Sequence, residues 1–144
     1  MRAEFAWLKS RLPTLVYNAC LGEAKRRLSL LRDSKDYQRA RSLKKGGSER
    51  QKLFQQAKEK YQFNEYAIHA YVKNIQGSWL KEYIGSHVAQ KLATRAYAAA
   101  EKLLYRKAKR VRFKTKNQLN SIEEKTNTTG IRWKWFVFRR RDGA

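Results

Sequence analysis

Four basic side chains occupy alternate positions late in the chain: Arg110, Arg112, Lys114 and Lys116. Val111 and Phe113 stand between the first three of them. Because successive side chains of an extended chain point to opposite sides, the four cations would share one side and the two apolar groups the other. A row of cations with an apolar back suits contact with a phosphate backbone. The pattern predicts a strand that binds nucleic acid.

The groups that could catalyse a reaction are scattered. Most carboxylates stand singly, and the one adjacent pair, Glu123 and Glu124, would point to opposite faces of a strand. His69 and His87 have no metal ligand or nucleophile at a useful spacing. Gly46 and Gly47 are not followed by the Lys-Ser/Thr of a phosphate-binding loop. We therefore expect a binding protein rather than an enzyme, with no metal and no cofactor.

The net charge indicates a polyanionic partner. The 144 residues include 34 Lys and Arg but only 12 Asp and Glu, so the formal net charge is +22. A field of one sign and this size attracts nucleic acid. Hydrophobic residues make up 42% of the chain, which is enough for a packed core. The sequence has neither a signal peptide nor an apolar run of about 20 residues, so we expect a cytoplasmic, nucleoid-associated protein without a membrane partner.

One helix is predicted over residues 14–31. Pro13 is expected in its first turn, where the missing N–H of proline costs no hydrogen bond. The candidate core contacts of this helix are Leu15, Ala19, Leu28, Leu30 and Leu31. Cys20 is interpreted as a small apolar residue of this helix rather than a reactive thiol, because no second cysteine exists to form a disulfide or a metal site.

A polar, basic stretch separates this helix from the next one. Ser48 and Gln51 fit a capping box, which would start a helix at about Glu49 and continue it through Leu53, Ala57 and Tyr61. Lys44 and Lys45 would then stand on a loop just before that helix. Two interpretations of this lysine pair stay open, a grip on phosphate and a solvated linker.

The clearest helical pattern runs over residues 86–107. Its apolar face is made by Val88, Leu92, Ala96, Ala99 and Leu103, and it is widened by Ala89, Ala93, Ala100 and Leu104. Lys91, Arg95 and Lys102 gather along one edge of that face. They are either a solvated border or a stripe that follows a nucleic-acid backbone.

After residue 109 the apolar period changes from 3.6 to 2. Residues 119–124 and 131–138 are predicted to be strands joined by a polar loop at 125–130. Trp133 and Trp135 would pack on the sheet, or stack on bases beside Arg132 and Lys134. The predicted fold class is α+β, a helical bundle over residues 1–108 followed by a small antiparallel sheet over 109–144.

Five segments carry a resemblance to a known family, and they lie at 17–21, 88–97, 110–114, 119–123 and 129–133. They begin with the motifs Tyr-Asn-Ala-Cys-Leu, Val-Ala-Gln-Lys-Leu, Arg-Val-Arg-Phe-Lys, Leu-Asn-Ser-Ile-Glu and Thr-Gly-Ile-Arg-Trp. In this order and spacing, over roughly residues 15–134, the chain resembles the N-terminal part of the transposon-encoded TnpB (OrfB) proteins. Those proteins are compact RNA-guided DNA endonucleases related to type V CRISPR effectors.

The resemblance implies a recognition lobe in the helical part and a partial wedge domain after it, which together hold guide RNA and the guide–target heteroduplex. It implies that one set of cations faces a nucleic-acid channel: Lys91, Arg95 and Lys102. It also implies a set on or near an RNA-contacting sheet: Arg110, Arg112, Lys114, Asn120 and Arg132. The predicted nucleic-acid-binding set is completed by Lys44, Lys45, Lys116, Trp133 and Lys134.

The family also continues into a nuclease domain with three metal-binding acids and a cysteine-rich zinc ribbon, and this sequence has neither. The leading strand of the wedge is shortened or absent as well. We expect a truncated or frameshifted form that binds guide-type RNA and DNA without cutting DNA, with a separately encoded nuclease portion as one further partner. A standalone basic DNA-binding regulator and a non-functional remnant of a transposase gene stay open as alternatives.

Overall fold

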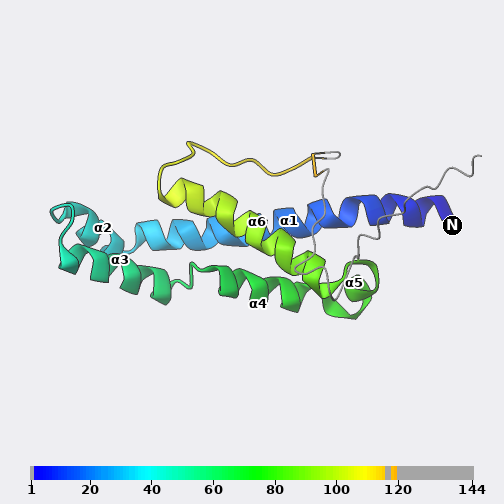
Figure 1. Cartoon of the computed structure of the whole chain (residues 1–144), viewed down its shortest axis with the longest axis horizontal. Helices are drawn as coiled ribbons and strands as arrows, with labels where there is room; N and C mark the ends of the chain where they lie inside the picture. The colour runs from blue at the N-terminus through cyan, green and yellow to red at the C-terminus, as the bar shows by residue number, and fades with distance from the viewer. Residues whose placement is uncertain (1, 116–117, 120–144) are drawn as a thin grey trace, which may run out of the picture.

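The computed structural model describes residues 2–115, 118 and 119. The described part contains six α-helices: α1 (Arg2–Asp33), α2 (Lys35–Ser42), α3 (Ser48–Lys60), α4 (Glu65–Ile75), α5 (Gly77–Tyr83) and α6 (Ser86–Leu104). Figure 1 shows an elongated bundle in which α1 runs along the molecule, α3 and α4 follow one another beside it, and α6 crosses α1. None of the described helices combines the length and apolar character needed to cross a bilayer.

The sheet of the predicted α+β fold is absent from the described residues, which are helical with no strand. Residues 110–115 form neither helix nor strand, and they run back over α1 and α6 (Figure 1). The alternation of cations and apolar groups suits any extended segment, and here the segment packs on a helix instead of pairing with a strand. Of the two predicted strands and their loop, only Leu119 lies within the described residues.

The core is formed mainly where α1 packs on α6. Buried residues of α1 recur every three or four positions: Leu12, Val16, Tyr17, Cys20, Leu21, Ala24, Leu28 and Leu31. The facing stripe of α6 is rich in alanine: Val88, Ala89, Leu92, Ala93, Ala96 and Ala100. Small side chains allow the two helix axes to approach closely, and α4 covers the other flank of α6 with Ile68 and Val72.

The predicted core face of α1 is partly wrong. Leu28 and Leu31 are buried as predicted, but Leu15 is 57% exposed, Leu30 is 44% exposed and Ala19 is only half-buried. The buried stripe passes through Val16 and Tyr17, so it is rotated by about one residue, roughly 100°, from the predicted face near the start of the helix. The spacing of apolar residues alone could not show which face of α1 is buried, because apolar residues occur on several sides of this helix.

The prediction that Pro13 starts a helix is also wrong, because Pro13 lies inside α1, which begins at Arg2. A proline there removes one backbone hydrogen bond from the helix. The prediction for Cys20 is confirmed, since its side chain is fully buried among apolar residues. Burial raises the pKa of the Cys20 thiol to about 12, which keeps it in the unreactive protonated form.

The helix predicted over residues 86–107 is confirmed, but it ends at Leu104, three residues earlier than predicted. Arg106 follows its C-cap with a φ of 55°, in the left-handed region that usually holds glycine. The N–H groups of Arg106 and Lys107 donate to the carbonyl oxygens of Leu103 and Lys102 at 3.4 and 2.8 Å. These two bonds form a Schellman motif, which turns the chain away from the helix axis.

The same motif ends α3. Gln62 has a φ of 50°, and the N–H groups of Gln62 and Phe63 donate to the carbonyl oxygens of Glu59 and Lys58 at 3.0 and 2.9 Å. At the other end, α3 begins at Ser48 after the N-cap Gly47, which makes no side-chain capping bond. The predicted helix is therefore confirmed, but the capping box is wrong.

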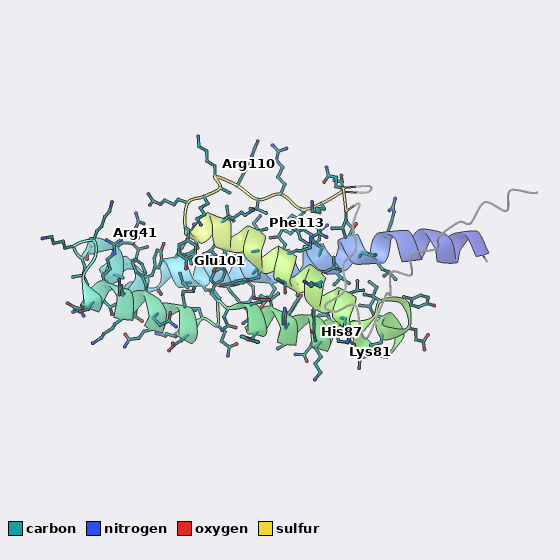
Figure 2. The ribbon with its side chains drawn as sticks, viewed as in Figure 1. Arg41, Lys81, His87, Glu101, Arg110 and Phe113 are labelled. Atoms are coloured by element: carbon teal, nitrogen blue, oxygen red, sulfur yellow. The ribbon has the colours of Figure 1, made fainter. Side chains whose placement is uncertain are left out.

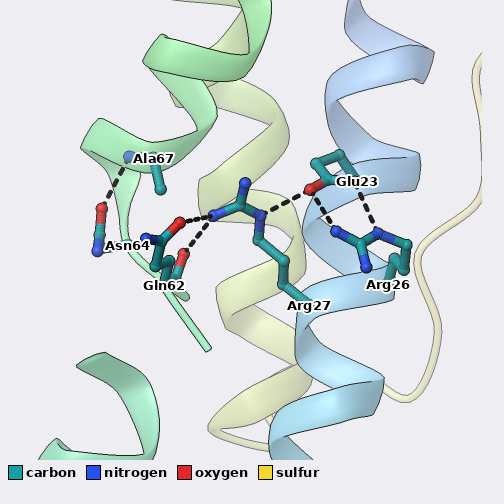
Figure 3. A network of polar contacts seen from close by, with 6 residues as sticks. All are labelled: Glu23, Arg26, Arg27, Gln62, Asn64 and Ala67. Atoms are coloured by element: carbon teal, nitrogen blue, oxygen red, sulfur yellow. Dashed lines mark hydrogen bonds and ion pairs between the residues drawn. The ribbon is translucent and has the colours of Figure 1, made fainter. Parts of the chain in front are cut away.

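An arginine network fastens this turn to α1 (Figure 3). Arg27 donates from Nη1 to the carbonyl oxygen of Gln62 at 3.0 Å and from Nε to Glu23 Oε1 at 2.7 Å. Arg26 holds the same carboxylate with two bonds of 2.9 and 2.8 Å. The bonds from Arg26, with help from Arg27 and against the opposing effect of burial, lower the pKa of Glu23 to about 2. Just beyond this turn, Asn64 caps α4 by accepting from the Ala67 N–H at 2.8 Å.

We expect Glu23→Gln to lower the free energy of unfolding at neutral pH. The difference from the wild type should become smaller in acid. Because the folded pKa of about 2 lies below the ordinary value of 4.5, the ionised carboxylate stabilises the wild type above pH 4.5. That contribution is lost as the pH falls from 4.5 to 2. Urea denaturation of both proteins across this window measures the difference, and a deficit that stays constant would contradict the network's role.

Candidate nucleic-acid interface

The segment after α6, residues 106–115, is called the basic arm below. It runs antiparallel to α1, because Val111 contacts Lys25 whereas Lys114, further along the arm, contacts Asn18. Figure 2 shows Arg110 pointing away from the helices and Phe113 on the side of α1. The arm is therefore an extended segment seated lengthwise on a helix.

The side chain of Asn18 forms the backbone hydrogen bonds with the arm that a neighbouring strand would otherwise form. Its side-chain Nδ2 donates to the carbonyl oxygen of Lys114 at 2.8 Å, and its Oδ1 accepts from the Lys114 N–H, also at 2.8 Å. The asparagine amide carries the same donor and acceptor as a peptide group, so it satisfies both backbone groups of one residue. An extended segment can thus be held without a β-sheet.

The arm lies on one face of α1. Asn18, Gly22 and Lys25 are spaced by four and three residues and therefore lie above one another on the helix. A Cβ at Gly22 would lie 3.8 Å from the ring of Phe113, so the glycine leaves the helix surface open to that ring. Lys25 Nζ lies 4.8 Å from the centre of the Phe113 ring and donates to the Val111 carbonyl oxygen at 3.1 Å.

The exposed cations of the arm lie on its outer side. They are Arg106, Lys107, Lys109, Arg110 and Arg112. Within the part of the chain that the structure describes, none of these side chains forms an ion pair. The sequence places no acidic residue between Glu101 and Glu123. Among the described residues, the arm therefore presents a concentrated positive charge that no ion pair compensates.

Of the alternate cations that were predicted to share one side, Arg110 and Arg112 are exposed, whereas Lys114 turns toward α1. Lys114 is half-buried, and its Nζ lies 5.6 Å from the centre of the Tyr17 ring and 3.4 Å from the Gln118 carbonyl oxygen. The two bonds to Asn18 fix the backbone of Lys114, and the ring face attracts its ammonium group. Lys114 therefore serves to dock the arm, and Lys116 lies outside the described residues.

The predicted cations of α6 differ in exposure. Lys91 and Arg95 are half-buried, and Lys102 is exposed. Burial raises the pKa of the Tyr17 hydroxyl, and the charge of Arg95 partly offsets that shift. Arg95 therefore acts on the same tyrosine whose ring Lys114 approaches.

Lys44 and Lys45 are exposed on the loop between α2 and α3, as predicted. The loop turns at Gly46, whose φ of 88° favours glycine. The remaining predicted site residues, Asn120, Arg132, Trp133 and Lys134, lie outside the described residues. The sequence predictions missed Asn18 and Lys25, because nothing local marks a contact between residues about 90 positions apart. They also missed Arg106, Lys107 and Lys109, which the acid-free run after Glu101 could have indicated.

One polar cluster has the residue types of a catalytic site. Thr94 Oγ1 donates to Glu65 Oε1 at 2.7 Å, and His69 Nε2 lies 2.8 Å from the same hydroxyl and 3.4 Å from the same carboxylate. His69 therefore has a hydroxyl and a carboxylate beside it, which the sequence pattern did not predict. The Thr94 hydroxyl donates to Glu65, and the cluster ties α4 to α6. No group of metal-ligating side chains occurs in the described part of the chain.

No protein-family model matches the chain, and no curated protein or solved structure matches it either. The function proposed below therefore depends on the charge and geometry of the described residues, together with the resemblance seen in the sequence.

We expect Asn18→Ala to release the arm, because the substitution removes both bonds to the backbone of Lys114. The amide of Lys114 should exchange with solvent at least about tenfold faster, which corresponds to the roughly 1.4 kcal/mol expected for lost buried hydrogen bonds. Hydrogen exchange followed by NMR measures this. Ser29→Ala, on an exposed part of the same helix, is the control. Unchanged protection in Asn18→Ala would contradict the docking role of Asn18.

Proposed function

We propose that the protein binds nucleic acid, structured RNA in the first place, through the basic arm and the adjoining cations of α6. The single observation that carries the proposal is the row of exposed cations over residues 106–112, which form no ion pair with the described part of the chain and are seated on α1 by backbone contacts of the arm. A docked arm loses less conformational freedom on binding than a free tail would, because its backbone is already ordered.

The expected contacts are to phosphates rather than to bases. Arginine and lysine on an extended segment meet a backbone of regular negative charge, and each phosphate that they neutralise releases counterions. Such contacts position a nucleic acid without reading its sequence. The protein is therefore proposed to recognise the shape and charge of its ligand.

The ligand class follows from the resemblance to the TnpB (OrfB) proteins, a family that no comparison matched. On that resemblance we propose a guide-type RNA, and DNA paired with it, as the ligands. The apolar back of the arm agrees with this proposal, because Phe113 and Val111 face α1 and leave the cations free to meet a strand.

A filter-binding titration with a structured RNA hairpin and a DNA duplex tests the proposal. We expect the affinity for the hairpin to fall steeply, by about 10³-fold or more, between about 50 and 200 mM salt if six or more phosphates are contacted. A flat salt dependence would refute binding by phosphate contact. Preference for one defined DNA site over the hairpin would instead favour the DNA-binding regulator.

We expect Arg110→Gln and Arg112→Gln to weaken the binding of every RNA tested, whatever its sequence. Each substitution should lower the slope of log affinity against log salt by about one, because each removes one phosphate contact. The matched control is Lys81→Gln, since Lys81 is an exposed cation of α5 and lies at the opposite edge of the molecule from Arg110 (Figure 2). An equal loss of slope in Lys81→Gln would show that binding is spread over the whole surface.

The two Schellman motifs allow a comparison of two glycine variants, one within the arm and one outside it. Arg106→Gly and Gln62→Gly should each stabilise the fold by about 0.5–1 kcal/mol, because glycine relieves the strain of a positive φ. Only Arg106→Gly should also weaken RNA binding, because only Arg106 is a cation of the arm. Thermal melts and the salt titration together measure both effects. If Arg106→Gly binds RNA as the wild type does, Arg106 has no part in the interface.

A further inference from the structure

A pocket of about 520 Å³ opens beside the start of the basic arm. Its walls come from the end of α1, from α2 and α3 with their connecting loop, and from the C-terminal end of α6. Arg41, at the α2–α3 end of the molecule in Figure 2, stands on one wall and Arg106 on another. The volume lies within the range of about 300–1,000 Å³ that is usual for small-ligand pockets.

Apart from Leu31 and Leu104, the lining consists of two kinds of side chain. Five are cationic: Arg41, Lys45, Arg50, Lys58 and Arg106. Three are aromatic: Tyr37, Phe54 and Tyr105. No carboxylate lines the pocket, so nothing within it neutralises the five charges.

Several of these groups are held in place by contacts with one another. Arg50 donates to the Leu43 carbonyl oxygen at 3.2 Å, and its guanidinium lies 5.3 Å from the centre of the Phe54 ring. Lys58 Nζ lies 3.4 Å from the Tyr105 hydroxyl and 5.8 Å from the centre of the Tyr105 ring, which is 55% exposed. The pocket therefore has an aromatic wall that a ligand can reach.

Other cations of the pocket are exposed and have no partner in the described part of the chain. These are Arg41, Lys45 and Arg106. An aromatic surface beside unpaired cations is suited to a ligand with a flat ring and a negative charge, because the ring can stack while the charge is neutralised. An anionic ligand without a ring could not stack on the aromatic wall.

We propose that this pocket binds one unpaired nucleotide, with its base on Tyr105 and its phosphates between Arg41, Lys45 and Arg106. Arg106 belongs both to the pocket and to the basic arm, so a strand whose phosphates follow the arm would reach the pocket with its next nucleotide. The nucleotide comes either from such a strand, in which case this inference rests on the proposed function, or from a free nucleotide.

The experiment compares four probes by calorimetry: ATP, inorganic triphosphate, an RNA hairpin with one bulged adenosine, and the same hairpin fully paired. Tyr105→Leu removes the stacking ring, Tyr105→Phe keeps it, and Arg112→Gln changes the arm but not the pocket. Circular dichroism melts show that each variant is folded before it is compared.

In the strand-borne case the bulged hairpin binds more tightly than the paired one, and Tyr105→Leu abolishes that advantage, with a loss of about tenfold. In the free-nucleotide case ATP binds more tightly than triphosphate, and Tyr105→Leu reduces its affinity by a similar factor. In either case Tyr105→Phe binds as the wild type does. Arg112→Gln weakens both hairpins equally.

The inference is overturned if neither the bulge nor the base of ATP improves binding, or if Tyr105→Leu leaves all four affinities unchanged. In that event, a loss of hairpin affinity in Arg112→Gln would show that the arm still binds RNA and that only the pocket was misassigned. If Arg112→Gln also binds both hairpins as the wild type does, the proposed function fails with the inference.

Discussion

The packing of α1 against α6 holds this protein together against its own charge. A formal net charge of +22 opposes any compact state, so the apolar contact between the two helices must exceed both that repulsion and the entropy of ordering the chain. The alanine stripe of α6 permits close approach to the buried stripe of α1, and Arg32 secures the far end by donating to the Leu103 carbonyl oxygen. The positions of α4, the basic arm and the pocket all depend on this helix pair.

Ion pairs in the described part of the chain neutralise a small part of this charge. Glu23 is held by two arginines, Asp36 pairs with Lys60 and Glu49 pairs with Arg39. The arm takes part in none of these ion pairs, and its cations lie on the solvent side. Among the described residues, positive charge is thus left without ion pairs where a polyanion is proposed to bind.

The helix α6 could be predicted from sequence because its apolar period is clean, although its predicted end lies three residues too late, and α2, α4 and α5 were not individually predicted. The face of α1 and the position of Pro13 within it could not, since apolar residues occur on several sides of that helix. The basic arm shows a different limit. An alternating pattern indicates an extended backbone, but it does not say whether the partner is a strand or, as here, the side chain of Asn18 from the other end of the chain. Arg110 and Arg112 were predicted from their own spacing, whereas Arg106, Lys107 and Lys109 were missed and the pocket depends on tertiary packing.

The central claim is that the docked arm is the surface that meets nucleic acid. The most direct test is an NMR titration of the isotopically labelled full chain with an RNA hairpin, followed through the backbone amides. The account predicts that shifts concentrate in residues 102–114 and in the part of α1 beneath them, and that α4 and α5 stay unchanged. Shifts that centre on α4 and α5, or that leave the arm unperturbed while RNA binds, would contradict it.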